Sequence, residues 1–535
     1  MTTNLASAPA LRASYDQLPY VRRPHPQTHP EHLATLALLF GVTPPPLATA
    51  RVLELGCAAG DNLIPMAMQL REAQFVGVDF SPRQIAVGRA MVADLQLANI
   101  ELREADIGAV DATWGQFDYI VCHGIYSWVP APIRARILAI CRDRLAPRGV
   151  AYVSYNALPG WRTRGTVRDM MIYHTAQLTD AASKVEQARS IIGFLAENAF
   201  ADTPHYAMAL KSEAETLGKV ADAYVFHEHL EPVNEAFYFH QFAEAAREHR
   251  LAYLAEANFR DMMVTNLPAP VIETLTRIAP DIVRLEQYMD FVRNRMFRQT
   301  LLVHDDVVVN RRLDWQPLRA MYFVGVAEPM DGAPRLDSDA EHSFRTAPGA
   351  IFAVSHPLIK AAMALLWERR PQALAFADLL AEAQAMTAAA TGADSGRDGT
   401  EQNAASLGAT LLHCYGAGWV EIRSWAPQFA ITPSDRPRAS PMARLQARSD
   451  GLVTNLRHER VPLDAFARMV LELLDGTRDR AALLAAISSD AQRRAEALRQ
   501  RGAAPVAAGP ELADALAQSL DACLIQLGRA ALLCD

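Results

Sequence analysis

Between residues 51 and 156, short apolar runs alternate with longer segments whose apolar residues recur at helical spacing. Ser81 and Pro82 offer an N-cap and a first helical residue, so one helix is expected to begin there. Residues 130–145 predict another helix. Regular alternation of strands and helices is typical of an α/β domain with a parallel sheet. The predicted strands cover residues 52–55, 74–80, 100–106, 117–123 and 149–156.

The carboxyl ends of these strands are the expected place for a ligand. In an open parallel sheet, ligands bind in the crevice just beyond those ends. We therefore expect one crevice to collect a residue from each of the five strand ends: Gly56, Asp79, Asp106, His123 and Asn156.

The turn after the first strand is suited to a nucleoside. Gly56 and Gly60 permit turn dihedrals and a close backbone approach that a side chain would forbid, and the helix that follows begins with free N–H groups. Asp79 ends the next strand, where a carboxylate can accept hydrogen bonds from ribose hydroxyls. A dinucleotide is disfavoured because Ala58 and Asp61 stand at two glycine positions of G-x-G-x-x-G, and Asp61 would repel a pyrophosphate.

The pattern changes after the fifth strand. Residues 163–235 and 261–295 are rich in helix formers and are interpreted as helical insertions, whereas residues 250–256 and 297–303 predict two further strands of the same sheet. The first domain is therefore expected to cover residues 1–305.

Residues 306–535 are expected to form a mostly helical, winged-helix-like region. Helices are predicted at residues 356–366, 376–386 and 407–415, with a short strand at 419–422. The polar stretch 387–405, rich in Ala, Gly, Ser and Thr, is interpreted as a flexible loop.

The insertions contain a set of arginines and a pair of histidines that could bind a ligand, and a structural role is favoured for both. Arg293, Arg295 and Arg298 lie close in sequence to Glu286 and Asp290. They are interpreted first as a salt-bridged helix face and second as a site that binds a peptide carboxylate. His227 and His229 would share a face only on a strand and have no evident third ligand, so a metal pair is disfavoured.

Composition narrows the class of protein. The chain has 535 residues, half of them hydrophobic, and a net charge of −8, which favours a soluble multi-domain enzyme without a nucleic-acid partner. No signal peptide or membrane-spanning run is apparent, so we expect a cytoplasmic protein with no membrane insertion. The six cysteines form no C-x-x-C or Cys/His spacing, and no metal site is expected.

The residues around the turn resemble motifs I and II of class I S-adenosylmethionine methyltransferases. Glu54 precedes Gly56 by two residues, Gly60 follows it by four, and Asp79 ends the second strand; Ala58 departs from the family's commoner glycine. The resemblance implies a Rossmann-like sheet and S-adenosyl-L-methionine as cofactor.

A closer resemblance covers nearly the whole chain. It is to bacterial methyltransferases that carry a methyltransferase regulatory domain, including rickettsial protein-lysine methyltransferases of outer-membrane protein B. It implies N-methylation of protein lysines, with an outer-membrane or surface protein as one class of acceptor, and a homodimer formed through inserted helices. The motifs that carry it are residues 15–20, 53–58, 62–65, 123–128, 154–156, 159–161, 287–291, 295–298 and 474–479.

A lysine acceptor requires a neutral amine. Desolvation in an aromatic pocket lowers the pKa of an ammonium group, and Tyr126 and Trp128, just after the fourth strand, are candidates for its walls. Tyr155 or Trp161, after the fifth strand, is a further candidate. Core packing is the alternative role of all these aromatic residues. The predicted catalytic residues are His123, Tyr126, Trp128 and Asn156.

Most remaining site residues are expected near the first three strand ends. Asp106 and Ile107 are expected to frame the adenine, and Asn62 either binds the cofactor's methionine part or caps its helix. His123 either accepts the amine proton or contacts cofactor or substrate. The predicted cofactor-binding residues are Glu54, Gly56, Cys57, Gly60, Asn62, Asp79, Phe80, Gln84, Asp106, Ile107 and His123.

The sequence leaves three functions open. The first is a protein-lysine N-methyltransferase. The second is a small-molecule or natural-product methyltransferase, and the third is a regulatory module that binds the cofactor without transferring its methyl group.

Overall fold

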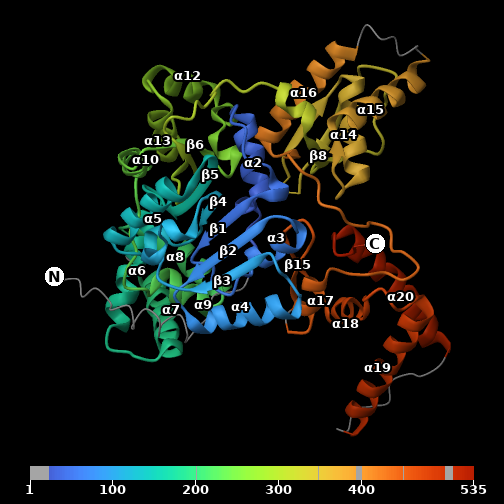
Figure 1. Cartoon of the computed structure of the whole chain (residues 1–535), viewed down its shortest axis with the longest axis horizontal. Helices are drawn as coiled ribbons and strands as arrows, with labels where there is room; N and C mark the ends of the chain where they lie inside the picture. The colour runs from blue at the N-terminus through green and yellow to red at the C-terminus, as the bar shows by residue number, and fades with distance from the viewer. Residues whose placement is uncertain are drawn as a thin grey trace. The chain divides into compact units, whose positions relative to one another are not determined.

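A computed structural model describes residues 23–199, 202–347, 349–392, 400–449, 451–500 and 510–534. The motif at residues 15–20 lies outside them. The chain divides into two compact units (Figure 1). The first unit contains Leu36–Arg311, and the second contains Arg23–Thr35 together with Arg312–Asp535. The boundary near the N-terminus falls within helix α2 (Pro30–Leu39).

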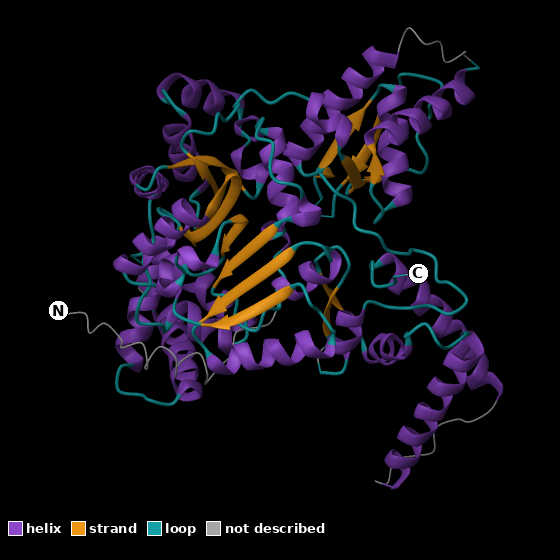
Figure 2. Cartoon of the chain, viewed as in Figure 1, coloured by secondary structure: helices purple, strands orange, loops and turns teal. Residues whose placement is uncertain are grey.

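The first unit is built on a seven-stranded sheet, drawn in orange in Figure 2. Its strand order is β3-β2-β1-β4-β5-β7-β6. All neighbouring pairs from β3 to β5 are parallel, and β7 is antiparallel to both β5 and β6. This confirms the predicted α/β fold. The strands are β1 (Arg51–Leu55), β2 (Gln74–Asp79), β3 (Ile100–Glu104), β4 (Phe117–Cys122), β5 (Leu145–Asn156), β6 (Leu251–Glu256) and β7 (Phe297–His304).

Helices pack against this sheet through apolar faces. The Oγ of Ser81 accepts a hydrogen bond from the N–H of Gln84 at 3.2 Å, and Pro82 follows as the first helical residue, as the sequence predicts for this N-terminus. Phe242 and Ala246 share one buried cluster with Ile137 and Leu138, so their two helices cover the same region of the sheet. The helices are α3 (Leu63–Gln69), α4 (Pro82–Asp94), α5 (Ala131–Arg144) and α10 (Phe239–Glu248).

The first predicted insertion is helical and has its own core. Val185, Ile192, Leu210 and Phe226 belong to one buried cluster that is separate from the sheet's cluster. Such a core lets the insertion fold as a helical layer of the first unit. Its helices are α6 (Trp161–Thr175), α7 (Ala181–Asn198), α8 (Pro204–Lys219) and α9 (Asp222–His229).

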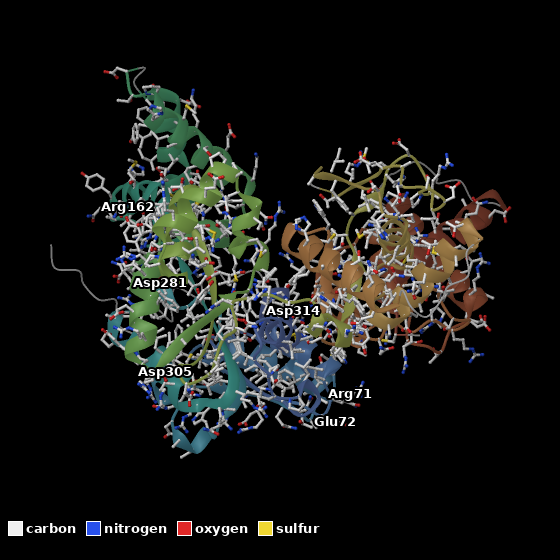
Figure 3. The ribbon with its side chains drawn as sticks, turned by 90° about the horizontal axis from the view of Figure 1, so that it is seen from above. Arg71, Glu72, Arg162, Asp281, Asp305 and Asp314 are labelled. Carbon is white, nitrogen blue, oxygen red and sulfur yellow. The ribbon has the colours of Figure 1, made fainter. Side chains whose placement is uncertain are left out.

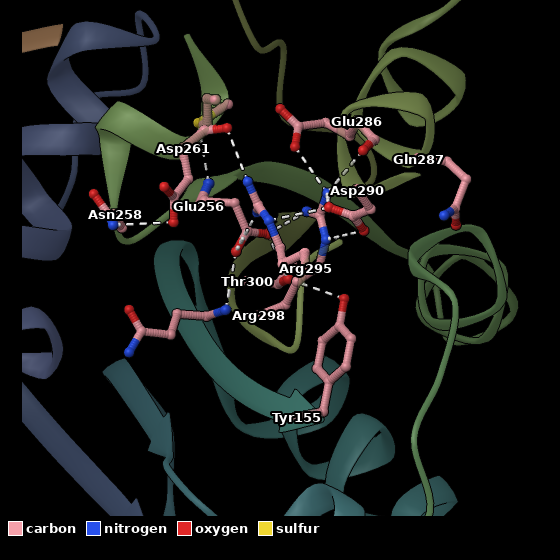
Figure 4. A network of polar contacts seen from close by, with 12 residues as sticks. Tyr155, Glu256, Asn258, Asp261, Glu286, Gln287, Asp290, Arg295, Arg298 and Thr300 are labelled. Atoms are coloured by element: carbon pink, nitrogen blue, oxygen red, sulfur yellow. Dashed lines mark hydrogen bonds and ion pairs between the residues drawn. The ribbon is translucent and has the colours of Figure 1, made fainter. Parts of the chain in front are cut away.

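The second predicted insertion contains α11 (Phe259–Met262), α12 (Ala269–Ile278) and α13 (Ile282–Arg293). Its last helix is joined to β6 and β7 by a buried ion network centred on Arg298 (Figure 4). The guanidinium donates to Glu256 at 2.7 Å, Glu286 at 2.9 Å and Asp290 at 2.8 Å. The side chains of all four residues are no more than 2% exposed. The predicted ion pairs with Glu286 and Asp290 are therefore present. They lie in the interior, however, and Arg298 belongs to β7 and not to the helix.

The charges of this network depend on one another. Burial alone would lower the pKa of Arg298, but Glu256, Glu286 and Asp290 hold it well above its usual value. Burial raises the pKa of Glu286 and of Asp290, while Arg298 opposes that shift. The guanidinium also lies 3.8 Å from the ring centroid of Phe239, so this cation ties α10 to the same network.

The part of the second unit up to β13 contains helices and two three-stranded sheets. One sheet has the order β12-β8-β13 and the other the order β11-β10-β9. The elements of this part are β8 (Tyr322–Gly325), β9 (Glu328–Pro329), β10 (His342–Arg345), β11 (Ile351–Val354), α14 (Pro357–Arg369), β12 (Leu374–Ala375), α15 (Phe376–Thr391), α16 (Thr400–Ala417) and β13 (Val420–Arg423). The predicted loop 387–405 is wrong at both ends, since α15 continues to Thr391 and α16 begins at Thr400. Its alanines favour a helix. Residues 393–399 lie outside the described part.

The remainder of the second unit packs around a cluster that includes Val470, Leu471, Ile487 and Leu520. Its elements are α17 (Pro441–Ala447), β14 (Leu452–Thr454), β15 (Arg460–Pro462), α18 (Ala465–Leu473), α19 (Arg480–Gln500) and α20 (Pro510–Arg529). Within the described ranges, no helix combines the length and apolar character needed to cross a membrane. Those ranges also hold no group of three or more His, Cys, Asp or Glu side chains placed to bind a metal.

The Arg298 network predicts a large cost for removing its central cation. In Arg298→Met, three buried acidic side chains lose their shared partner, and breaking a buried ion pair typically costs about 3–5 kcal/mol. The free energy of unfolding, measured by urea denaturation, should fall by that amount. Arg247→Met removes an exposed pair with Glu244 on α10 and should leave the unfolding midpoint unchanged. Equal midpoints for the two variants would show that the network does not stabilise the fold.

Candidate functional site

The turn after β1 is held against the end of β2. The N–H groups of Gly56 and Cys57 both donate to the carbonyl oxygen of Val78, at 2.8 and 3.0 Å. Gly56 has φ +75°, and a Cβ there would lie 2.4 Å from the side chain of Ile125. The positive φ and the close neighbour together explain why a glycine stands at this position.

Gly77, within β2, leaves the space that a side chain of the same turn occupies. A Cβ at Gly77 would lie 2.7 Å from the sulfur of Cys57, so the strand makes room for the buried Cys57 side chain. Burial raises the pKa of that thiol well above its ordinary value. The turn continues through Ala58, at φ 47°, to Gly60, at φ +77°, so its backbone lies just beyond the carboxyl end of β1.

Asp79 connects the two turns that border the crevice. One carboxylate oxygen accepts from the N–H of Ala58 and the other from the N–H of Ser81, each at 2.9 Å. Burial raises the pKa of Asp79, and these backbone hydrogen bonds oppose the shift. An ionised carboxylate can accept about four hydrogen bonds, so this half-buried group retains capacity for ligand hydroxyls. The arrangement fits the predicted ribose contact.

Glu54 supplies a second carboxylate at the end of β1. Its Oε1 accepts from the side-chain amide of Asn62 at 2.8 Å, and its buried Oε2 has no hydrogen-bond partner among the described residues. Burial raises the pKa of Glu54 to about 8. An unsatisfied buried carboxylate oxygen is costly unless a donor meets it, and the ammonium group of an amino-acid ligand is such a donor. These residues therefore fit a cofactor that carries an amino-acid part.

Asn62 occupies the N-cap position of α3 without capping it through its side chain. That side chain donates to Glu54 instead. Asn62 thus orients the acid. The sequence alternatives for Asn62, cofactor contact or helix cap, did not include this role.

The other predicted cofactor-binding residues lie around β2 and β3. Phe80 is half-buried and Gln84 lies in the first turn of α4. Asp106 is exposed, accepts from the N–H of Gly108 at 2.7 Å, and begins a short 3-10 helix that contains Ile107. Because Asp106 caps this helix, it is not part of β3, which ends at Glu104, two residues before the predicted strand end.

His123 lies at the end of β4 and contacts side chains of β5. Its Nδ1 is 2.8 Å from the hydroxyl of Tyr152 and 3.4 Å from that of Ser154. Its ring meets the edge of Phe297 with a centroid separation of 6.1 Å. These contacts orient the half-buried imidazole of His123 at the end of β4. Its role in catalysis stays a prediction.

The aromatic residues expected as acceptor walls are largely buried. Tyr126 packs in T-shaped contact with Phe237 and Phe242, and burial raises its pKa to about 12. Tyr155 stacks on Phe242 with ring centroids 4.1 Å apart. Trp128 and Trp161 are only 7% and 6% exposed. Packing is thus the observed environment of all four rings, and the wall role of Tyr126 and Trp128 stays a prediction.

Asn156 ends β5 and joins several segments. Its backbone N–H donates to the Oγ of Ser127 at 2.8 Å, and its carbonyl accepts from the N–H of Phe237 at 3.0 Å. Its side-chain nitrogen lies 3.5 Å from the Oδ1 of Asn234. Residues 234–237 thus cross the ends of β4 and β5. No sequence pattern pointed to this segment, since it lies between two helices and has no motif of its own.

Family models match three parts of the chain. A model described as "Methyltransferase domain" matches residues 52–149, and one described as "Predicted methyltransferase regulatory domain" matches residues 221–304. A third, "PKMT, C-terminal winged helix domain", matches residues 435–532. The winged-helix match therefore lies within the predicted C-terminal region, after the helices at 356–415 on which that prediction was based.

Similar proteins extend the match to most of the chain. An uncharacterized protein of Rickettsia prowazekii (strain Madrid E) is 36% identical over 480 residues, which are 88% of this chain and 85% of the relative. The structure of PKMT2 from Rickettsia typhi is 31% identical, with a TM-score of 0.84, and covers 97% of this chain and 100% of that one. The same protein in complex with AdoHcy is 30% identical, with the same TM-score and coverage.

The raised pKa of Glu54 predicts a pH-dependent gain in stability for Glu54→Gln. In the wild type, the stabilising contribution of protonated Glu54 is fully present below the ordinary value of 4.5 and is lost as the pH rises toward about 8. The neutral amide has no such dependence. The Tm of Glu54→Gln relative to wild type, without ligand, should therefore rise from pH 5 to pH 8 and then level off.

Differential scanning fluorimetry measures this difference. Glu72→Gln, an exposed substitution after α3, provides the same change of charge outside the crevice and should show no such trend. A pH-independent difference between Glu54→Gln and wild type would mean that Glu54 is already ionised near neutrality.

Proposed function

We propose that this chain N-methylates lysine side chains of proteins. It belongs to the family of class I methyltransferases with a methyltransferase regulatory domain and a PKMT-type winged helix. The chain is an S-adenosylmethionine-dependent methyltransferase. The lysine acceptor is the proposal. The observation that carries it is the likeness to PKMT2 over 97% of the chain, both units included.

Methyl transfer depends mainly on how the protein positions the methyl donor and the acceptor nitrogen. Bound S-adenosylmethionine supplies an activated methyl group, and an acceptor nitrogen held in line with it reacts without a covalent enzyme intermediate. Glu54, oriented by Asn62, would hold the donor's amino-acid end, and Asp79 would hold its ribose. His123, Tyr126, Trp128 and Asn156, at the ends of β4 and β5, are left for the acceptor side.

A lysine acceptor must lose its proton before it reacts. With an ordinary pKa of about 10.4, only about one amine in a few thousand is neutral at pH 7. Burial among aromatic rings lowers that pKa by penalising the charged form. The apolar surroundings of Tyr126 and Trp128 support this role, and the Asn156 side chain is a candidate to orient the neutral nitrogen.

Transfer of a labelled methyl group tests the proposal. The protein is incubated with methyl-labelled S-adenosylmethionine and a lysate of its own source, and labelled protein is hydrolysed and analysed for N-methyl-lysine. Label should appear in protein as methyl-lysine. Asp79→Asn, which weakens the link between the two turns, should lower the yield at least tenfold, whereas the exposed Glu72→Gln should not change it.

Other outcomes separate the alternatives. Label that enters only small molecules would favour a small-molecule methyltransferase. Binding of AdoHcy without transfer to any fraction would favour a regulatory module.

The inserted helices also support a homodimer. Tyr173, Phe194 and Met208 are 87%, 59% and 68% exposed on α6, α7 and α8. Large apolar side chains gathered on one insertion are typical of a surface that another molecule covers. We place the dimer interface on these three helices.

Replacing these apolar side chains should abolish the dimer. The triple variant Tyr173→Ser, Phe194→Ser and Met208→Ser is expected to elute as a monomer with unchanged helix content. Size-exclusion chromatography with light scattering measures the mass. Val308→Ser, at an 86% exposed position outside the insertion, should remain dimeric. A wild-type protein that is monomeric at all concentrations would rule out this interface.

A further inference from the structure

A groove runs between α5 and α10 over one face of the first unit's sheet. Its cavity volume is about 540 Å³, within the range of ligand sites. It is lined on α5 from Ala131 to Leu138 and on the α10 side from Gln241 to His249. Seven residues of helix rise about 10 Å, a length that accommodates about three residues of an extended peptide.

One end of this groove reaches the acceptor side of the crevice. Tyr126, four residues after the end of β4, and Leu158, two residues after the end of β5, both line it. Phe237, whose N–H donates to the carbonyl of Asn156, also lines it. The other end lies at Glu248, where α10 leads into the start of β6. A chain that leaves the acceptor position can therefore continue along this groove.

The lining combines an aromatic floor with a charged rim. Tyr126, Phe237 and Phe242 form the floor. On the rim, Arg134 is paired with Glu235 at 2.6 Å. Arg162 is exposed, and within the described ranges its guanidinium has no hydrogen bond or ion pair (Figure 3). The end of the groove nearest the strand ends thus presents an uncompensated cation.

We infer that this groove binds an extended segment of the protein acceptor beside the methylated lysine, with Arg162 pairing with an acidic side chain of that segment. This inference rests on the proposed function. The groove's length fits a short peptide stretch, its floor fits apolar side-chain stems, and Arg162 selects the charge. Acceptor lysines with a nearby Asp or Glu are therefore preferred over those with a nearby Arg.

Peptide binding in the presence of AdoHcy tests the inference. The probes are two fluorescein-labelled seven-residue peptides with one central lysine, flanked within three positions by aspartates in one and by arginines in the other. Fluorescence anisotropy should give a Kd about fivefold lower for the acidic peptide. Arg162→Glu should reverse this preference, while Arg71→Glu, exposed on the loop after α3 (Figure 3), should preserve it.

A second pair of variants tests the location. Ala135→Trp fills the groove from the exposed side of α5 and should raise the Kd of the acidic peptide at least tenfold without changing AdoHcy affinity. Ala90→Trp, the same substitution at an exposed position of α4, should bind like wild type. Equal affinity of wild type for both peptides, or unchanged binding by Ala135→Trp, would overturn the inference.

Replacing AdoHcy by S-adenosylmethionine separates this inference from the proposed function. Groove-dependent binding without methyl-lysine in either peptide would count against lysine methylation and leave the groove assignment standing. Methyl-lysine formed equally well by wild type and Ala135→Trp would overturn the groove assignment alone.

Discussion

The hydrogen bonds between the turn after β1 and the end of β2 fix the position of the half of the candidate site that lies at these two strands. Val78 receives two backbone N–H groups from the turn, and Asp79 accepts a third from Ala58. Asp79 also accepts from the N–H of Ser81, the N-cap residue of α4, so the same carboxylate is joined to the start of that helix. The two carboxylates assigned to the donor are consequently placed by backbone geometry, with little dependence on surface side chains.

Burial of Glu54 is electrostatically unfavourable in the absence of a ligand. Desolvation dominates its raised pKa, Asp79 and Asp61 raise it further, and the hydrogen bond from Asn62 only partly offsets them. A site selected for stability alone would have a neutral side chain there. An arriving ammonium group changes the balance, since it supplies the missing donor and favours the ionised acid. The cost of burying the Glu54 carboxylate and its affinity for a cationic ligand thus have the same cause.

The sequence predicts what depends on local pattern. The buried strands around Val52 and Ile120 are apolar on consecutive positions, and Ser81-Pro82 begins a helix, so the fold followed directly. Arg298 shows the limit, because its partner Glu256 lies 42 residues away and no spacing rule joins them. Likewise, Tyr126 and Tyr155 follow strand ends as active-site residues often do, yet their rings meet Phe237 and Phe242 from a distant segment. Tertiary packing, which sequence pattern does not encode, decided both environments.

The segment matched by the regulatory-domain model is a structural part of the catalytic sheet. Residues 221–304 supply β6 and β7, α10 and the crossing segment at residues 234–237. Phe237 bonds to Asn156 at the end of β5, while α10, two residues later, packs on Arg298 through Phe239. A displacement of this region would therefore reach the end of β5 through a short covalent connection, without passing through the turn after β1.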